Sequence, residues 1–273
     1  MRFEGAITVG GKDAPDAAVV GFQEVIPPLD RLAEFVPDTR ALADQHIVGF
    51  NTRTVSARPF TLLRAQLLKR MRAANWKLVG ITSATPGVGK SFVANNLSAA
   101  LSRLSDIQTY LFDLDLRRAS LARNFGLIGE GGLTEYLEGG DISLGSIGKR
   151  IANTNLGFFP CYPAGQVNSA ELLVGPRFDS LVTAMRRLPS DAIVICDLPP
   201  VFANDDAMIV SRMLDAYLLV IEEGVTTKKQ VREAMRLLAP SPCIGTVLNR
   251  FVGGIGDNYG YGYGMKYGSY YDG

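Results

Sequence analysis

The chain has 273 residues, of which 28 are basic and 27 acidic, so its formal net charge is +1. That length suits one α/β domain with a large core and short appendages. A charge so close to zero gives no global field toward nucleic acid or an anionic membrane, and we expect no nucleic-acid partner.

Residues 1–50 show no sustained hydrophobic period. They contain scattered acidic residues and prolines, among them Pro27, Pro28 and Pro37, a composition typical of a loosely structured segment. The sequence therefore predicts a leader without a fold of its own over these residues.

Residues 51–76 are expected to form a basic amphipathic helix segment that starts near Pro59. The stretch 51–77 carries seven basic residues and no acidic ones. Apolar residues recur in it at helical spacing, namely Leu62, Leu63, Leu67, Leu68 and Met71. Two roles remain open for this helix: packing on the main domain, or self-association and lipid contact.

Residues 77–252 alternate short apolar runs with helical patterns and are expected to form the main domain. The runs typical of strands are 77–83, 109–113, 156–160, 191–197, 217–222 and 244–248. The helical patterns cover 91–104, 177–188, 205–214 and 227–238. Such alternation implies right-handed crossovers and an α/β fold, with a mainly parallel sheet covered by helices on both faces. Ligands of such sheets bind beyond the carboxyl ends of the strands.

Residues 253–273 differ sharply in composition from the domain before them. They hold eight glycines and six of the ten tyrosines. No hydrophobic core can be built from these residues, so we expect a flexible tail that displays its tyrosines.

The strongest motif is a glycine loop at residues 84–91, placed between a predicted strand and a predicted helix. Gly87 and Gly89 let backbone N–H groups turn toward phosphate oxygens at a helix N-terminus. Lys90 would reach the outer phosphates, and Ser91 would ligate Mg²⁺. The loop therefore predicts a P-loop ATPase that binds ATP with Mg²⁺. The expected nucleotide-binding residues are Thr85, Pro86, Gly87, Val88, Gly89, Lys90, Ser91 and Phe92.

Acidic residues follow two of the predicted strands. Asp113 and Asp115 stand two positions apart just before Arg117, and Asp197 closes another apolar run. Because the carboxyl ends of parallel strands meet at one edge of a sheet, these carboxylates should converge on the glycine loop. Asp197 would then hold the Mg²⁺ shell through water.

Together these elements resemble the bacterial tyrosine kinases of capsule and exopolysaccharide synthesis, P-loop ATPases related to the MinD and ParA group. That family combines a phosphate loop, an Asp-x-Asp-x-Arg element and a hydrophobic strand ending in Asp-x-Pro-Pro. The resemblance covers residues 60–250 and continues in the tyrosine cluster. Supporting stretches are 132–137 and 164–173, with Val201, Phe202, Asp206 and Ala207.

The resemblance implies a role for each matched residue. Asp113 is the candidate base near the incoming tyrosine hydroxyl, and it joins Ser91 and Asp197 as a metal residue. Asp115 and Arg117 shape the catalytic site together with Lys90, and Asn249 lies where the family contacts adenine. The implied autophosphorylation sites are Tyr259, Tyr261, Tyr263, Tyr267, Tyr270 and Tyr271.

The helix before the phosphate loop departs from the family pattern. The family's Glu-x-x-Arg-x-x-Arg, which mediates ring assembly, aligns with Arg58, Thr61 and Arg64, so only Arg64 is retained. The sequence therefore does not support ring formation through this motif. Two other departures, Val88 for glutamate and Leu198 for serine or threonine, remove no phosphate or metal ligand.

The remaining residues bear on compartment and chemistry. Cys161, Cys196 and Cys243 are far apart without metal-ligand spacing, which favours buried positions in a reducing cytosol. No apolar run approaches the ~18 residues that span a bilayer, and the N-terminus shows no signal peptide. The only histidine, His46, lies in the predicted leader, so histidine catalysis is set aside. We expect a cytoplasmic protein, recruited to the membrane by a partner.

Three functions remain open. The first is a protein-tyrosine autokinase that regulates polysaccharide polymerisation or export with a membrane-embedded chain-length (co-polymerase) protein, as a homo-oligomer, and with a cognate phosphotyrosine phosphatase. The second is a non-kinase ATPase switch of the partitioning type, many members of which have a lysine where this chain has Thr85. The third is a nucleotide-binding scaffold of the polysaccharide machinery.

Overall fold

A computed structural model describes residues 24–51, 54–162, 165 and 167–251. Its described part is built on one sheet with the strand order β1-β4-β5-β3-β6-β2-β7-β8. Neighbouring strands pair in parallel except β4 and β5, which are antiparallel. The predicted α/β fold with a mainly parallel sheet is thereby confirmed.

The six predicted strands are present, each within one residue of its expected bounds. They are β2 (Leu78–Ser83), β3 (Gln108–Asp113), β5 (Leu156–Phe159), β6 (Ala192–Asp197), β7 (Ala216–Glu222) and β8 (Cys243–Asn249). Two short strands were not predicted, β1 (Ala33–Phe35) and β4 (Lys149–Ile151). Each has three residues, too few for a hydrophobic period to show.

The predicted helices begin within one residue of their expected starts and end up to three residues early. They are α3 (Lys90–Leu101), α8 (Pro176–Arg186), α9 (Asp206–Ser211) and α10 (Lys228–Leu238). Shorter helices fill the connections: α1 (Thr39–Asp44), α4 (Leu121–Asn124), α5 (Leu133–Leu137), α6 (Leu144–Ile147) and α7 (Ser169–Leu173), with 3-10 turns at Leu29–Arg31 and Val55–Ala57.

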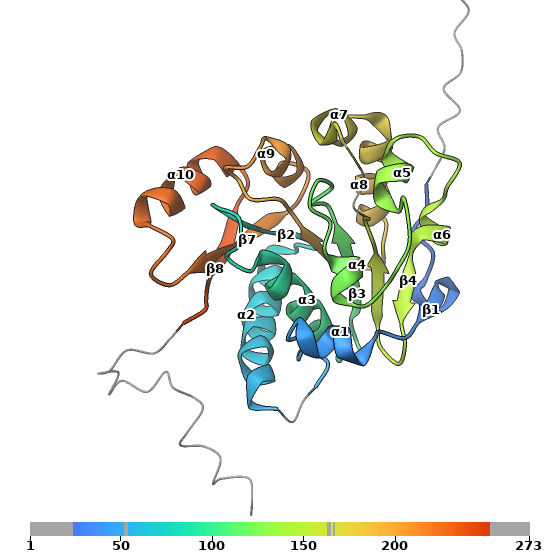
Figure 1. Ribbon diagram of the computed structural model, residues 1–273, viewed down its shortest axis with the longest axis horizontal. Coiled ribbons are helices and arrows are strands. Elements are labelled where there is room, and N and C mark those ends of the chain that lie inside the picture. The colour runs from blue at the N-terminus through green and yellow to red at the C-terminus, as the bar shows by residue number, and fades with distance from the viewer. Residues whose placement is uncertain (1–23, 52–53, 163–164, 166, 252–273) are drawn as a thin grey trace, which may run out of the picture.

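The central strands bury both of their faces. In β3, Tyr110 and Phe112 belong to one core, and Leu111 between them belongs to another. This is the period of two that a pleated strand imposes. The core that contains Leu111 lies against α2 (Arg58–Ala74) and α3, whereas α8 covers the core of Tyr110 and Phe112. Figure 1 shows α1 to α3 on one side of the sheet and α7 to α10 on the other.

The expected basic helix is α2 (Arg58–Ala74). Pro59 lies in its first turn, and Asn75 ends it in the left-handed conformation with φ 54°. Leu67, Leu68 and Met71 are buried in the same core as α3, so packing on the main domain is the role that the structure confirms for this helix. Among the described residues no helix is long and apolar enough to cross a membrane.

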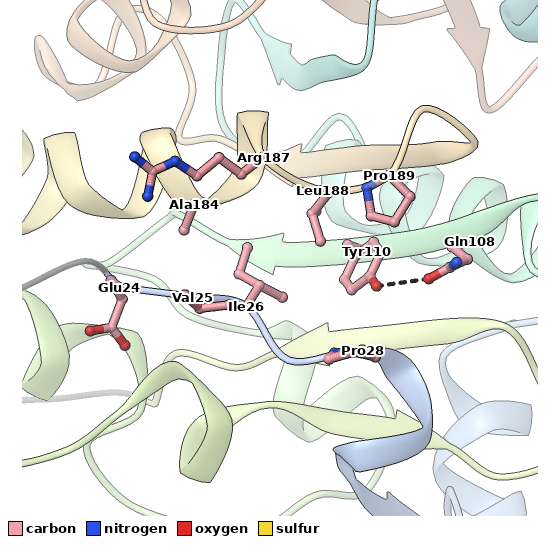
Figure 2. A pocket seen from close by; sticks show the side chains of 10 residues that line it. All are labelled: Glu24, Val25, Ile26, Pro28, Gln108, Tyr110, Ala184, Arg187, Leu188 and Pro189. Atoms are coloured by element: carbon pink, nitrogen blue, oxygen red, sulfur yellow. Dashed lines mark hydrogen bonds between the residues drawn. The ribbon is translucent and has the colours of Figure 1, made fainter.

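The predicted leader is wrong for residues 24–50, while residues 1–23 lie outside the described part. Ile26, Leu29 and Leu32 are buried in the core that α8 covers. Figure 2 shows the segment from Glu24 to Pro28 running past Tyr110 and the end of α8, around a cavity of about 140 Å³.

A single polar side chain on α3 fixes the end of this segment. The Oδ1 atom of buried Asn96 accepts hydrogen bonds from the backbone N–H groups of Val48 (2.8 Å) and Gly49 (2.9 Å). A Cβ atom on Gly49 would lie 2.2 Å from the carbonyl oxygen of Asn96. The segment is therefore held by contacts distant in sequence, which a local period does not reveal.

A Leu32→Ala variant tests whether residues 24–50 are part of the domain. Leu32 is 4% exposed, so we expect the free energy of unfolding to fall by about 2–4 kcal/mol, the usual cost of truncating a buried leucine. Urea denaturation measures the change. Val36→Ala is the control, because Val36 is 72% exposed, and it should cost under about 0.5 kcal/mol. Equal small effects of both substitutions would show that the segment is dispensable to the core.

Candidate active site

The glycine loop connects β2 to α3 at the carboxyl edge of the sheet. Gly87 and Gly89 adopt φ values of 83° and 94°, which only glycine adopts without strain. A Cβ atom on Gly89 would also lie 2.1 Å from the side-chain nitrogen of Asn249. As the N-cap of α3, Gly89 offers no side chain to the first turn. The unpaired N–H groups of that turn and the helix dipole make this end of α3 suited to an anion.

Two carboxylates contact the ammonium of Lys90, and a third lies beside them on the neighbouring strand. Its Nζ atom lies 2.7 Å from Oδ2 of Asp115 and 3.5 Å from Oδ2 of Asp197. The hydroxyl of Ser91 donates a hydrogen bond of 2.6 Å to the same Asp197 oxygen. Asp113 pairs directly with Asp197 in the register of β3 and β6. The predicted convergence of these residues at one sheet edge is present in the structure.

Burial governs the charge of this cluster. Asp113 and Asp197 are fully buried and Asp115 is 3% exposed. Burial, together with the charge of Asp197, raises the pKa of Asp113 to about 8, although the backbone N–H of Leu121 opposes the shift. Burial also raises the pKa of Asp197 against the opposing effects of Lys90 and Ser91.

The pKa of Lys90 is also raised. Burial alone would lower it, but the carboxylates of Asp197 and Asp115 outweigh that cost. One ammonium thus faces three carboxylates, and the Oδ1 atoms of Asp113 and Asp197 are buried without a hydrogen-bond partner. Unpaired buried carboxylate oxygens are costly, and a cation would satisfy them.

These residues fit the Mg²⁺ that a P-loop implies. In the described part of the chain, no three His, Cys, Asp or Glu side chains are arranged as a metal centre of their own. Mg²⁺ with a nucleotide does not need such a centre, because it takes one or two protein ligands and completes its shell with phosphate oxygens and water. Ser91 and Asp197, with Asp113 beside them, provide those protein oxygens.

Two adjoining hollows open at the glycine loop, and Lys90 lines one of them. The loop hollow has a volume of about 380 Å³, and the side hollow next to it has about 200 Å³. The loop hollow is lined by Pro86, Gly87, Gly89, Lys90, Ser91, Phe92, Asp115, Arg118, Ser120, Arg123 and Pro200. The side hollow is lined by Pro86, Asp115, Arg117, Arg118, Pro199, Pro200, Ala203 and Asn204. Their shared residues show that the two hollows adjoin.

Most residues expected to bind nucleotide lie at the loop hollow, and the others support it. Val88 is buried, and its carbonyl accepts a 2.8 Å hydrogen bond from the side chain of Asn249. Thr85 uses its backbone carbonyl to accept a hydrogen bond from the hydroxyl of Ser83. Asn249, at the end of β8, is therefore beside the loop.

The three catalytic candidates after β3 occupy different depths. Asp113 is fully buried, where Oδ2 accepts hydrogen bonds from the N–H groups of Ser120 and Leu121. Asp115 lines both hollows. Arg117 is held by another helix, since its Nε donates a 2.6 Å hydrogen bond to the hydroxyl of Ser169 on α7. The sequence placed these residues at one edge but could not rank their exposure.

Sequence reasoning missed three residues that line the loop hollow: Arg118, Ser120 and Arg123. Arg118 directly follows the recognised Asp-x-Asp-x-Arg element, so its position carried a usable signal. Ser120 and Arg123 lie at the start of α4 and within it. Such a short helix has no period to reveal which of its residues face a cavity.

Known proteins resemble this chain in sequence and in structure, although no protein-family model matches it. It is 35% identical over 208 residues to the tyrosine-protein kinase Etk of Escherichia coli strain K12, covering 73% of this chain and 27% of that protein. It is 31% identical to the tyrosine-protein kinase CpsD of Streptococcus agalactiae serotype III, covering 64% of this chain and 74% of that protein.

The kinase domain of Escherichia coli tyrosine kinase ETK is similar in structure. It superposes with a TM-score of 0.70 at 28% sequence identity, covering 88% of this chain and 99% of that domain. The chain thus spans about a quarter of the length of Etk and nearly all of its kinase domain.

Proposed function

The chain belongs to the bacterial tyrosine-protein kinases, and from this membership we propose that it transfers the γ-phosphoryl group of ATP to tyrosine hydroxyls, including those of its own tail. One observation carries the proposal: the ammonium of Lys90 lies between Asp115 and Asp197 at the end of the glycine loop. Phosphoryl transfer depends mainly on such positioning and charge stabilisation.

The loop residues would hold the nucleotide. N–H groups of the loop and of the first turn of α3 bind phosphate oxygens, and Lys90 leaves its carboxylate partners to contact the outer phosphates. Asn249, which stands beside the loop, would contact the adenine. Ser91, Asp113 and Asp197 would hold Mg²⁺, which would neutralise charge on the phosphates.

Asp115 is the carboxylate best placed to meet the acceptor hydroxyl. It lines both hollows, whereas Asp113 has no exposed surface. Burial therefore favours Asp113 as a metal residue, and Asp115 accepts the tyrosine proton once Lys90 has turned to the nucleotide. The base assigned to Asp113 by family resemblance thus moves to its neighbour in this proposal.

The proposed acceptors lie outside the described residues. They are the tail tyrosines Tyr259, Tyr261, Tyr263, Tyr267, Tyr270 and Tyr271. Glycines between several of them leave the hydroxyls unobstructed, and each phosphate adds about 1.5–2 negative charges. Tail phosphorylation would then regulate polysaccharide polymerisation or export.

The partners of the chain are likewise proposed from its membership of the bacterial tyrosine-protein kinases. A membrane-embedded chain-length protein would recruit it from the cytoplasm to the inner membrane face, and a phosphotyrosine phosphatase would reset its tail. Assembly into homo-oligomers would not use the family's helix motif, because only Arg64 of that motif is retained. The Arg64 side chain donates a 2.7 Å hydrogen bond to the backbone carbonyl of Ala100 in its own α3.

Incubation of the purified chain with Mg-ATP tests the proposal. Mass spectrometry should find phosphotyrosine on the tail, and omission of Mg²⁺ should abolish it. ATP hydrolysis without phosphotyrosine would favour the partitioning-type switch. Nucleotide binding without hydrolysis or phosphotyrosine would favour the scaffold.

A further inference from the structure

The side chain of Arg117 is anchored along one edge only. Its Nε atom donates to the hydroxyl of Ser169 at 2.6 Å and lies 3.8 Å from Oδ2 of Asp206. Asp206 is itself buried and accepts a 2.8 Å hydrogen bond from the side chain of Asn204. The guanidinium is thus held in place by buried groups on α7 and α9.

The opposite edge of the guanidinium is available. The side chain of Arg117 is 47% exposed, and no described residue accepts a hydrogen bond from its two terminal nitrogens. These nitrogens form the fork that binds a carboxylate or phosphate with two parallel hydrogen bonds. An anchored guanidinium with a free fork loses little freedom when it binds an anion.

Arg117 lies in the hollow that adjoins the loop hollow. It lines the side hollow, which shares Pro86, Asp115, Arg118 and Pro200 with the loop hollow. An extended polypeptide advances about 3.3–3.6 Å per residue. A tyrosine that reaches Asp115 therefore brings a residue next to it in sequence into the side hollow.

We propose that Arg117 is a specificity residue that binds the carboxylate of an acidic residue adjacent to the acceptor tyrosine. The inference rests on the proposed kinase function. The carboxylates of Asp115 and Asp197 beside Lys90 disfavour an acidic segment, and a cation at the side hollow offsets that repulsion. Because Arg117 is half exposed, the preference should be about three- to tenfold.

The tail provides both an acidic and a neutral context for tyrosine. Tyr271 is followed directly by Asp272, whereas Tyr261 stands between two glycines. Arg117 should favour Tyr271 over Tyr261 in the same chain. The ratio of their phosphorylation rates is an internal measure, because a general loss of folding or activity lowers both rates together.

The experiment uses the full chain with Mg-ATP and mass spectrometry at early times. Asp272→Asn should lower the Tyr271 to Tyr261 ratio about three- to tenfold. Arg117→Gln should lower it to a similar extent, and the double variant should show no further loss, because both changes remove the same contact. Arg212→Gln, an exposed arginine at the end of α9, is the matched control and should leave the ratio unchanged.

The possible outcomes distinguish failure of the Arg117 proposal from failure of the proposed kinase function. A ratio unaffected by Asp272→Asn, or independent effects of the two substitutions, overturns the role of Arg117 while the kinase function stands. Absence of phosphotyrosine in the unmodified chain overturns the proposed function and this inference with it.

Discussion

A Lys90→Met variant is expected to form no detectable phosphotyrosine and to bind ATP much more weakly. The loop amides alone cannot balance the charge of the outer phosphates, and methionine keeps the length of the side chain without its ammonium. Loss of such a charge-stabilising group from a preorganised site costs about 10²–10³ in rate, and loss of a phosphate contact weakens binding as well.

Mass spectrometry of the tail and calorimetric titration with Mg-ATP measure both effects. Lys69→Met is the matched control, because Lys69 is an exposed residue of α2. It removes the same charge away from the loop and should change neither quantity. Unaltered phosphotyrosine in Lys90→Met would refute the assignment of the loop as the catalytic site.

An Asp113→Asn variant is expected to lose activity. Without metal, at high pH, it is expected to be more stable than the unmodified chain. The pKa of Asp113 is raised from its ordinary value to about 8, chiefly by burial and by the charge of Asp197. A raised carboxyl pKa stabilises the fold at low pH, and that contribution is lost as the pH rises toward 8. Asparagine remains neutral, so the variant should escape this loss.

Above pH 8 the metal-free variant should therefore be more stable than the unmodified chain by about 1–3 kcal/mol, the usual cost of a buried charged oxygen without a partner. With Mg-ATP the order should reverse, because the variant lacks a proposed metal oxygen, and phosphorylation should fall about 100-fold or more. Urea denaturation at pH 5 and 9, with and without Mg-ATP, measures the crossover.

Asp106→Asn is the control for both the stability and the phosphorylation measurements, since the side chain of Asp106 is 69% exposed. It should leave the pH dependence and the activity as they are. Parallel pH profiles for the unmodified chain and Asp113→Asn would show that Asp113 has the same pKa in the folded and the unfolded chain, which contradicts the prediction.

Local patterns were sufficient for the central part of the fold. Strands buried on both faces, such as β2 and β6, appear in sequence as short continuous apolar runs. The loop between Ser83 and Lys90 could be placed because strand, glycines and helix occur in one contiguous stretch. The carboxylates could be placed because parallel strands end at the same edge.

The N-terminal segment could not be predicted in this way. The segment is held in place by Asn96, a polar residue on α3 that accepts hydrogen bonds from the backbone N–H groups of Val48 and Gly49. Nothing in residues 24–50 marks them as partners of a helix that lies so far along the chain. Burial of Leu32 likewise depends on a core supplied by other elements.

The depth of each site residue could not be predicted for a related reason. Both Asp113 and Asp115 follow β3 in the same motif, and the sequence does not show that Ser120 and Leu121 pack over Asp113 while Asp115 lines the two hollows. Arg117 was expected at the catalytic centre, yet its hydroxyl partner Ser169 comes from a separate helix. Depth and side-chain direction are tertiary properties.

The hydrogen bond from Asn249 to Val88 joins two regions that should differ greatly in their opening rates. Amides in β3 and β6, at the middle of the sheet, exchange with solvent through opening of the whole domain, whereas an edge strand such as β8 opens locally. Each opening of the β8 end must release a contact of the phosphate loop. A nucleotide that fixes the phosphate loop should therefore slow amide exchange at the end of β8. The local opening of β8 and nucleotide binding to the loop are in this way thermodynamically linked.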